Sequence, residues 1–442
     1  FLLLPFCTLN MPNHTQFFHN IVQLPPDPLF GVSARSKADT RPQRVDLVLG
    51  AYRDNDGKPW ILPSVKLAER KIIDDPNYNH EYLPIEGFKS LTNAASKITL
   101  GEDSVFYKNP NKVVSIQSLS GTGSLHIAAK FLYQWHSNQS DDPDLLKLVL
   151  VSQPTWSNHI QIFQSVGFTV DSYRYWDYHK KAIDLVSFLN DLSNAPNGSI
   201  VLLHSCAHNP TGLDPTHEQW LQILNVIKDK HHLPIFDTAY QGFASGDLDK
   251  DAWALRKGVE IVGELTPIII CQSFAKNTGM YGERVGCIHI TLPDFLLDDR
   301  DAIYSQLKKI TRSELSNPPS YGAKIVSLLL NDQDLFVQWK KDLITMSSRI
   351  KKMRYELKKH LVELKTPGNW DHITNQIGMF SFTGLSEHHV QRLAEEHAVY
   401  LISSGRASIA GLNDKNVLYT AKAIDEVVRY YLKYSPPIKS RL

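Results

Sequence analysis

The sequence predicts an α/β protein built on a mainly parallel sheet with helices on both faces. Two features of the chain predict its class and its number of domains. β-Rich runs alternate with helix-like segments through the middle of the chain, as expected where helices connect parallel strands. The chain also has 442 residues, 42% of them hydrophobic, which can bury a large core and exceed the usual size of one compact unit. We therefore expect two domains.

Six segments are predicted to be strands of this sheet. Each is a nearly continuous apolar run, which is typical of parallel strands buried on both faces. The predicted strands are residues 113–119, 147–152, 199–205, 233–238, 267–273 and 286–291.

Helical periodicity predicts helices at residues 122–135, 217–228 and 252–262. Residues 334–364 are predicted to form one long helix or two. In this segment an apolar stripe is formed by Ile350, Met353, Leu357 and Leu361. The basic residues around it are Lys351, Lys352, Arg354, Lys358 and Lys359. We interpret these basic residues as a solvated face rather than a surface for nucleic acid.

Composition excludes several classes of partner. Lys plus Arg total 47 against 46 for Asp plus Glu, so no overall charge favours nucleic acid or an anionic membrane. No apolar run approaches the roughly 20 residues needed to span a bilayer. The cysteines show no close CxxC pairing, which favours a reducing intracellular compartment. They are Cys7, Cys206, Cys271 and Cys287.

The two ends of the chain bear on its cellular location. Residues 1–10 lack a basic leader and a small-residue cleavage site, so neither a signal nor a transit peptide is predicted. They are either part of a truncated leader or foreign to a native chain that starts at Met11. The chain ends in Ser440-Arg441-Leu442, which has the pattern of a peroxisomal address, with a chance tail as the alternative. We expect a cytoplasmic location, a peroxisomal one, or both, rather than a mitochondrial one.

Ligands of open α/β sheets bind beyond the carboxyl ends of the strands, and four predicted strand ends here carry unusual side chains. The first continues into the glycine-containing run SGTGS at residues 120–124 and then into a helix. This arrangement directs backbone N–H groups and the helix dipole toward an anion such as a phosphate. A simple tight connection is the alternative. The run matches neither GxxxxGKS/T nor GxGxxG, which disfavours a nucleotide or dinucleotide site.

The second strand end continues into HSCAHNPTG at residues 204–212, and the third contains Asp237 and Tyr240. Taken alone, an Asp at such a position is only a helix cap or a metal ligand in about half of cases. His204 and His208 suggest zinc, but no third ligand with zinc-site spacing follows them. We therefore predict no metal site.

The fourth strand end carries Lys276, with Arg284 eight residues later. A lysine directly after a buried strand is desolvated, which favours the neutral, nucleophilic amine that reacts with carbonyl compounds. Most lysines near strand ends are simply exposed to solvent. A reactive lysine is favoured here by the features that accompany it, namely the phosphate loop, the strand-end Asp, Tyr240 and Arg284.

Six motifs occur in order: SGTGS, HNPTG, DTAYQGF, SFAKNTGMYGERVG, SNPP and GRASIAGL. Together they resemble class I aspartate aminotransferases, and the resemblance covers residues 30–430. Within that family the chain is similar to the eukaryotic cytosolic and peroxisomal forms. The resemblance implies the type I fold of pyridoxal-phosphate-dependent transferases. It places a large domain at residues 60–343, a smaller α/β domain at 27–59 and 344–442, and an N-terminal arm at 1–26.

By this resemblance, Lys276 binds pyridoxal 5'-phosphate covalently and moves the substrate proton as general base and acid. Asp237 pairs with the pyridine nitrogen and keeps it protonated, and His159 orients Asp237. Trp156 stacks on the ring, with an ordinary core aromatic as the alternative reading. The phenolic oxygen of the cofactor is bound by Tyr240 and Asn209. Its phosphate is bound by Ser120, Gly121, Thr122, Ser273, Arg284 and the partner subunit's Tyr82.

The resemblance also implies a substrate with two carboxylates. Arg406 binds the α-carboxylate in a pocket lined by Gly50, Trp156 and Asn209, and the partner subunit's Arg312 binds the distal one, since a guanidinium matches a carboxylate with two hydrogen bonds. The expected reaction is L-aspartate plus 2-oxoglutarate giving oxaloacetate plus L-glutamate, by a ping-pong route through pyridoxamine phosphate.

Sharing of Tyr82 and Arg312 between chains implies a homodimer with shared sites. The alternatives are an aminotransferase of aromatic or broader specificity, and a catalytically silent binding protein of the same fold.

Overall fold

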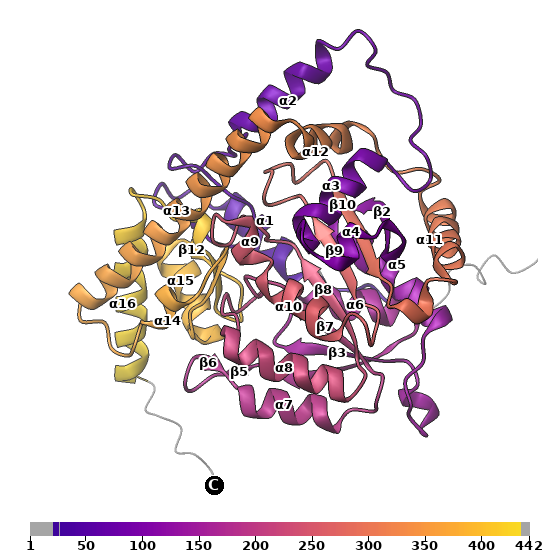
Figure 1. Cartoon of the computed structure of the whole chain (residues 1–442). Coiled ribbons are helices and arrows are strands. Elements are labelled where there is room, and N and C mark those ends of the chain that lie inside the picture. Colours follow the sequence, from indigo (N-terminus) through magenta and orange to yellow (C-terminus); the bar gives the residue numbers. More distant parts are fainter. Residues whose placement is uncertain (1–20, 26, 435–442) are drawn as a thin grey trace, which may run out of the picture.

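The structure is a computed structural model that describes residues 21–25 and 27–434 (Figure 1). The predictions made for residues 1–10, for Cys7 and for the Ser440-Arg441-Leu442 tail lie outside the described residues.

The central sheet of the described chain has seven strands in the order β2-β10-β9-β8-β7-β3-β4. Neighbouring strands are parallel, except that β10 runs antiparallel to both β2 and β9. The predicted α/β class with a mainly parallel sheet is therefore confirmed. The strands are β2 (Val113–Leu119), β3 (Leu148–Gln153), β4 (Thr169–Arg174), β7 (Ile200–His204), β8 (Leu233–Thr238), β9 (Ile269–Ser273) and β10 (Val285–Thr291).

All six predicted strands form. The sequence analysis missed β4, because this edge strand is mostly exposed and only its Tyr173 is buried. Its sequence therefore lacks the continuous apolar run that identifies the inner strands.

Helices cover both faces of the sheet (Figure 1). Side chains alternate between the faces of a strand. Ile200 and Leu202 of β7 accordingly pack in one core cluster with α5 and α6, whereas Val201 and Leu203 pack in another with α7, α8 and α10. The helices of the large region are α2 (Pro63–Ile73), α3 (Lys89–Leu100), α4 (Val105–Lys108), α5 (Ser120–Trp135), α6 (Ser157–Val166), α7 (Leu185–Asn194), α8 (His217–Asp229), α9 (Leu248–Asp251), α10 (Trp253–Val262), α11 (Arg300–Glu314) and α12 (Tyr321–Asn331).

The N-terminal segment lies with the C-terminal third of the chain. β1 (Val45–Asp46) pairs in parallel with β12 (Val399–Tyr400), and β11 (Phe380–Phe382) pairs with β13 (Arg406–Ser408). Two further short strands, β5 (Trp176–Asp177) and β6 (Ala182–Ile183), pair with each other. The remaining helices are α1 (Pro28–Ala38), α13 (Gln333–Glu363), α14 (His372–Asn375), α15 (Glu387–His397) and α16 (Val417–Tyr434).

The segment predicted as one long helix or two is a single helix, α13. Its apolar stripe is buried as predicted, and Lys351, Lys352 and Lys359 are exposed. The interpretation of Arg354 as part of the solvated face is wrong, because its exposed fraction is only 3%. Arg354 directly follows Met353 and lies three residues before Leu357, so helical geometry places it inside the apolar stripe.

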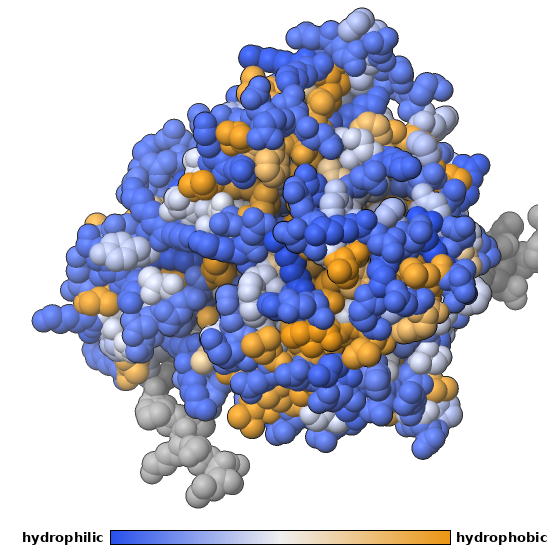
Figure 2. All heavy atoms as spheres, viewed as in Figure 1, coloured by the Kyte–Doolittle hydropathy of each residue, from blue (hydrophilic) through white to orange (hydrophobic). Residues whose placement is uncertain are grey.

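The surface in Figure 2 is mainly hydrophilic, with separate hydrophobic patches. Among the described residues, no helix combines the length and the apolar character needed to cross a membrane.

Candidate active site

Strand register gathers the predicted site residues at one edge of the sheet. Asp237 of β8 lies beside His204 at the end of β7, and Ser273 at the end of β9 lies beside Gly286. Because β10 is antiparallel, its first residue, Val285, lies beside Leu119 at the end of β2. The glycine-containing run at residues 120–124, Asp237 and the Lys276 segment therefore meet, as ligand sites of open α/β sheets require.

The amino end of α5 forms one end of the site. The glycine-containing run from Ser120 to Ser124 forms its first five residues, of which Ser120 and Gly121 precede the predicted start at residue 122. Thr122 lies in the first turn. The Oγ atoms of Ser120 and Ser273 are 2.7 Å apart. A Cβ atom on Gly121 would lie 3.4 Å from the Ser273 side chain and 3.8 Å from Asp237, so a side chain here would narrow the space in front of the helix. Hydroxyl and backbone donors at a helix amino end suit a phosphate.

A buried series of hydrogen bonds, called the Asp237 chain below, joins Asp237, His159 and Thr155. His159 Nε2 is 3.0 Å from Asp237 Oδ2, and His159 Nδ1 is 2.8 Å from Thr155 Oγ1. Burial by itself raises the pKa of Asp237, but the His159 hydrogen bond and nearby positive charge lower it below the ordinary value. Asp237 is therefore an ionised, oriented carboxylate, which suits a partner that carries a proton on a ring nitrogen.

Sequence reasoning missed Thr155 and considered His204 only as a metal ligand. Thr155 Oγ1 lies 3.4 Å from His204 Nε2, and the His159 and His204 rings are in edge contact. Burial lowers the pKa of His204 to about 3, so it is neutral at physiological pH. In the part of the chain that the structure describes, no group of three or more His, Cys, Asp or Glu side chains could hold a metal ion. The signal for both residues was their place at the carboxyl ends of neighbouring parallel strands: His204 is the last residue of β7, and Thr155 comes two residues after β3.

Lys276 lies on the next loop, with its Nζ 5.4 Å from the centre of the Tyr240 ring. Burial lowers the pKa of its amine, while Asp237 raises it and Arg284 lowers it further. The prediction that this lysine is desolvated therefore agrees with its surroundings. The loop is held by Asn277, whose side chain donates to Gln241 O at 3.1 Å and whose carbonyl accepts from Trp339 Nε1 at 2.7 Å. Burial therefore shifts Lys276 toward the neutral amine, the form that acts as a nucleophile and base.

Arg406 forms the opposite end of the site. It is buried, and it donates to Asn209 Oδ1 at 3.4 Å and to Val48 O at 3.1 Å. Its guanidinium lies 4.2 Å from the centre of the Phe380 ring, and its buried Nε has no hydrogen-bond partner. Gly50 allows this packing, since a Cβ there would lie 2.7 Å from Phe380 Cζ.

Within residues 21–25 and 27–434, no carboxylate forms a salt bridge with Arg406. Burial lowers its pKa to about 10, which leaves it charged at neutral pH. A buried guanidinium with neutral partners only is a site for an anion.

Trp156 begins the turn into α6, and its ring meets the His159 ring edge to face at 5.1 Å. Its side chain is partly exposed, and an indole in such a position can stack on a planar ligand.

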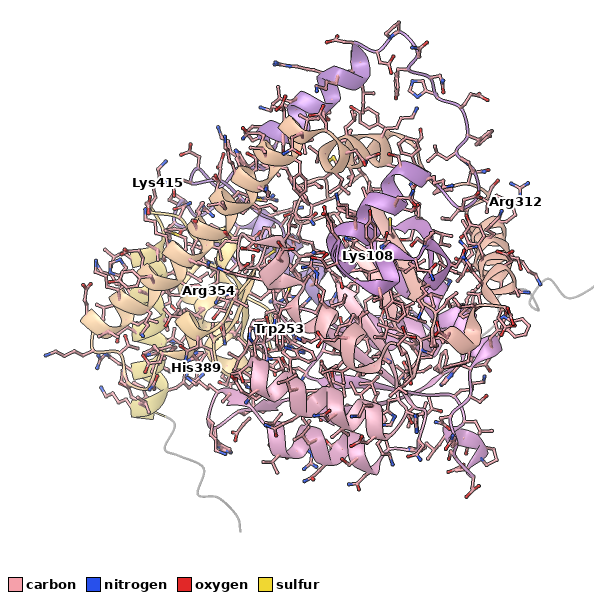
Figure 3. All side chains as sticks on the ribbon, in the orientation of Figure 1. Lys108, Trp253, Arg312, Arg354, His389 and Lys415 are labelled. Atoms are coloured by element: carbon pink, nitrogen blue, oxygen red, sulfur yellow. The ribbon has the colours of Figure 1, made fainter. Side chains whose placement is uncertain are left out.

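Tyr82 and Arg312 are not brought into this site. The exposed fraction of Tyr82 is 86%, and Arg312 points outward from the end of α11 at the edge of the molecule (Figure 3). The two regions are linked to each other: Asn317 donates to Leu83 O at 2.8 Å, and Ser316, which accepts from Arg312, donates to Asn317 at 2.9 Å. Tyr82 and Arg312 are therefore exposed side chains on two linked segments of the chain.

Residues 42–424 match the model of the family described as aminotransferase class I and II. The chain belongs to this family. It is 59% identical over 416 residues to the cytoplasmic aspartate aminotransferase of Saccharomyces cerevisiae, covering 94% of this chain and 97% of that one. It is 45% identical to the cytoplasmic enzyme of Gallus gallus, covering 93% and 98%.

Solved aminotransferase structures have the same fold. The aspartate aminotransferase from the cytoplasm of Saccharomyces cerevisiae superposes with a TM-score of 0.90 at 58% identity, covering 95% of this chain and all of that one. An aromatic-amino-acid aminotransferase from Burkholderia pseudomallei, covalently bound to pyridoxal phosphate, superposes with a TM-score of 0.87 at 35% identity, covering 93% and 99%. The predicted family, fold and enzyme class are confirmed.

Proposed function

We propose that this aminotransferase converts L-aspartate and 2-oxoglutarate into oxaloacetate and L-glutamate. The observation that carries the proposal is the buried guanidinium of Arg406, which forms no salt bridge with a carboxylate of the described residues. Like the Lys276 amine, it lies near Tyr240. The names of the relatives from Saccharomyces cerevisiae and Gallus gallus support aspartate as the amino donor.

The same residues fit pyridoxal 5'-phosphate as the cofactor. Ser120, Ser273 and the first backbone N–H groups of α5, at Gly121 and Thr122, would hold its phosphate, with Arg284 providing the positive charge. Asp237 would bind the ring nitrogen, and Tyr240 and Asn209 the phenolic oxygen. Trp156 would cover the ring, and Lys276 would hold the cofactor covalently. The gap that Gly121 leaves open in front of Ser273 and Asp237 supports this fit.

When bound, pyridoxal phosphate supplies an electron sink for the negative charge that develops at the substrate α-carbon. The Asp237 carboxylate, oriented by His159, holds a proton on the pyridine nitrogen. Lys276, whose burial favours the neutral amine, removes the proton from the substrate α-carbon as a base. As an acid it would then donate this proton to the cofactor carbon that carries the transferred nitrogen. Arg406 and Asn209 bind the α-carboxylate and orient the bond to be broken.

Aspartate specificity is tested by steady-state assay of the holoenzyme with aspartate, phenylalanine and tyrosine at saturating 2-oxoglutarate. We expect kcat/KM for aspartate to exceed that for either aromatic substrate by roughly 10²-fold, because a guanidinium left without its distal carboxylate is an unpaired polar group. Equal values would favour the aromatic or broader-specificity alternative. Absence of turnover, with no change in the visible cofactor band on adding aspartate, would favour the silent binding protein.

A homodimer with shared sites is part of this proposal. Tyr82 and Arg312 are exposed on two linked segments of one chain, where a second copy could contact them. We also propose the division into a large domain at 60–343 and a small domain at 27–59 and 344–442. The pairing of β1 with β12 supports it. Closure of the small domain would bring Arg406 onto the substrate and exclude water.

The location we propose is cytoplasmic, in line with the names of the relatives, with import into peroxisomes through Ser440-Arg441-Leu442. Fusing the last residues of the chain to a reporter should direct it to peroxisomes, because such addresses are read at the free carboxyl end. The same fusion without Leu442 is the control and should stay diffuse. A diffuse signal from both fusions would make the tail a chance match.

A further inference from the structure

Arg354 is a buried arginine whose charge is met only by backbone carbonyls. From the inner face of α13 (Figure 3), its Nη1 donates to Ile373 O at 3.1 Å, and its Nη2 donates to Gly378 O at 2.9 Å and Phe380 O at 2.5 Å. Within the described residues, its Nε has no hydrogen-bond partner. No carboxylate in the described chain forms a salt bridge with it. Burial lowers its pKa to about 9, which still leaves it charged at neutral pH.

Removing a guanidinium from water is costly unless hydrogen bonds to the charge offset the penalty. An apolar residue would fill this part of the α13 stripe without that penalty. The three carbonyls therefore indicate that Arg354 holds the chain between Ile373 and Phe380 in one conformation.

This chain segment touches both halves of the proposed carboxylate pocket. Ile377 N donates to Gly212 O at 2.6 Å, and a Cβ on Gly378 would lie 2.4 Å from Ala207 Cβ. Ala207 and Gly212 flank Asn209 on the large-domain loop. Two residues beyond Gly378, Phe380 provides the ring against which Arg406 lies.

We propose that Arg354 is a positioning residue for the substrate carboxylate. By holding residues 376–380, called segment 376–380 below, it fixes the position of the Arg406 guanidinium beside Asn209. This inference rests on the proposed role of Arg406. When Arg354 is lost, Gly378 and Phe380 lose a common hydrogen-bond donor, and Arg406 loses its fixed support. A lysine could not restore the arrangement fully, because one ammonium group lacks the planar fork that reaches several acceptors at once.

The test uses the holoenzyme with Arg354→Met and Arg354→Lys. Loss of charged hydrogen bonds that act through substrate binding raises KM while kcat stays within about threefold of wild type. For Arg354→Met we expect KM for aspartate, and the Kd of succinate as a dicarboxylate probe, to rise about tenfold. Arg354→Lys should lie between this variant and wild type. Hydrogen exchange of the peptide containing Ile377 should become faster in the same order.

Arg429→Met is the control, at an exposed arginine that also forms a salt bridge with Asp425. Arg429 also donates to two backbone carbonyls, at 3.0 Å from Leu364 O and 2.7 Å from Lys365 O, but these lie beyond the end of α13 and away from segment 376–380. It should lower the melting temperature without changing KM or the succinate Kd.

A purely structural role for Arg354 would give the same pattern as Arg429→Met, and that result would overturn the proposal. If Arg354→Met does not fold, wild-type KM and succinate Kd in Arg354→Lys would equally overturn it. Failure of the underlying function would appear separately, as a wild-type protein that neither transaminates aspartate nor binds succinate.

Discussion

Replacing Lys276 with Ala is expected to lower kcat/KM for aspartate by at least about 10⁴-fold, the upper end of what one acid–base group contributes. The same side chain is proposed to attach the cofactor and to move the substrate proton, so its removal affects two functions. The other proposed cofactor contacts, at Ser120, Asp237 and Tyr240, are unchanged. The variant should therefore still bind the cofactor, but with an altered visible absorption band.

Steady-state kinetics, the visible spectrum and circular dichroism test this prediction together. Lys341→Ala, which removes an exposed lysine from α13, serves as the control and should behave like wild type. Near-normal turnover in a folded Lys276→Ala protein would show that another group moves the proton.

The second large effect is a gain of activity on mixing two poorly active variants. One chain carries Lys276→Ala and the other Arg312→Asp. If each site takes Lys276 from one chain and Arg312 from its partner, one site of the hybrid receives both lesions and the other receives none. The purified hybrid should then have about half the activity of the native dimer, since a two-fold dimer has two equivalent sites.

Refolding each variant alone through the same dissociation step provides the control and should leave its activity low. If Arg312 served the site of its own chain, each hybrid site would carry one lesion, and the hybrid would be as inactive as its parents. The outward position of Arg312 on an isolated chain supports the first outcome.

Most of the site could be predicted from the order of residues along the chain. Asp237, Lys276 and Ser120 were identified because each follows or ends a buried strand, and a mainly parallel sheet brings such positions to one edge. Element ends were less certain. Helix α5 begins at Ser120, two residues before its predicted start.

The motifs by themselves determined the family. They also identified Lys276 and Asp237 as candidate site residues, since such positions depend on local order and strand register. Contacts between distant segments could be decided only by the tertiary structure. Arg406 meets Asn209 across 197 positions of sequence, and Thr155 extends the Asp237 chain to His204. Arg354 belongs to a residue type that is usually exposed, yet it is buried, and its hydrogen-bond acceptors are backbone carbonyls. Because every residue carries such a carbonyl, no sequence pattern identifies these acceptors.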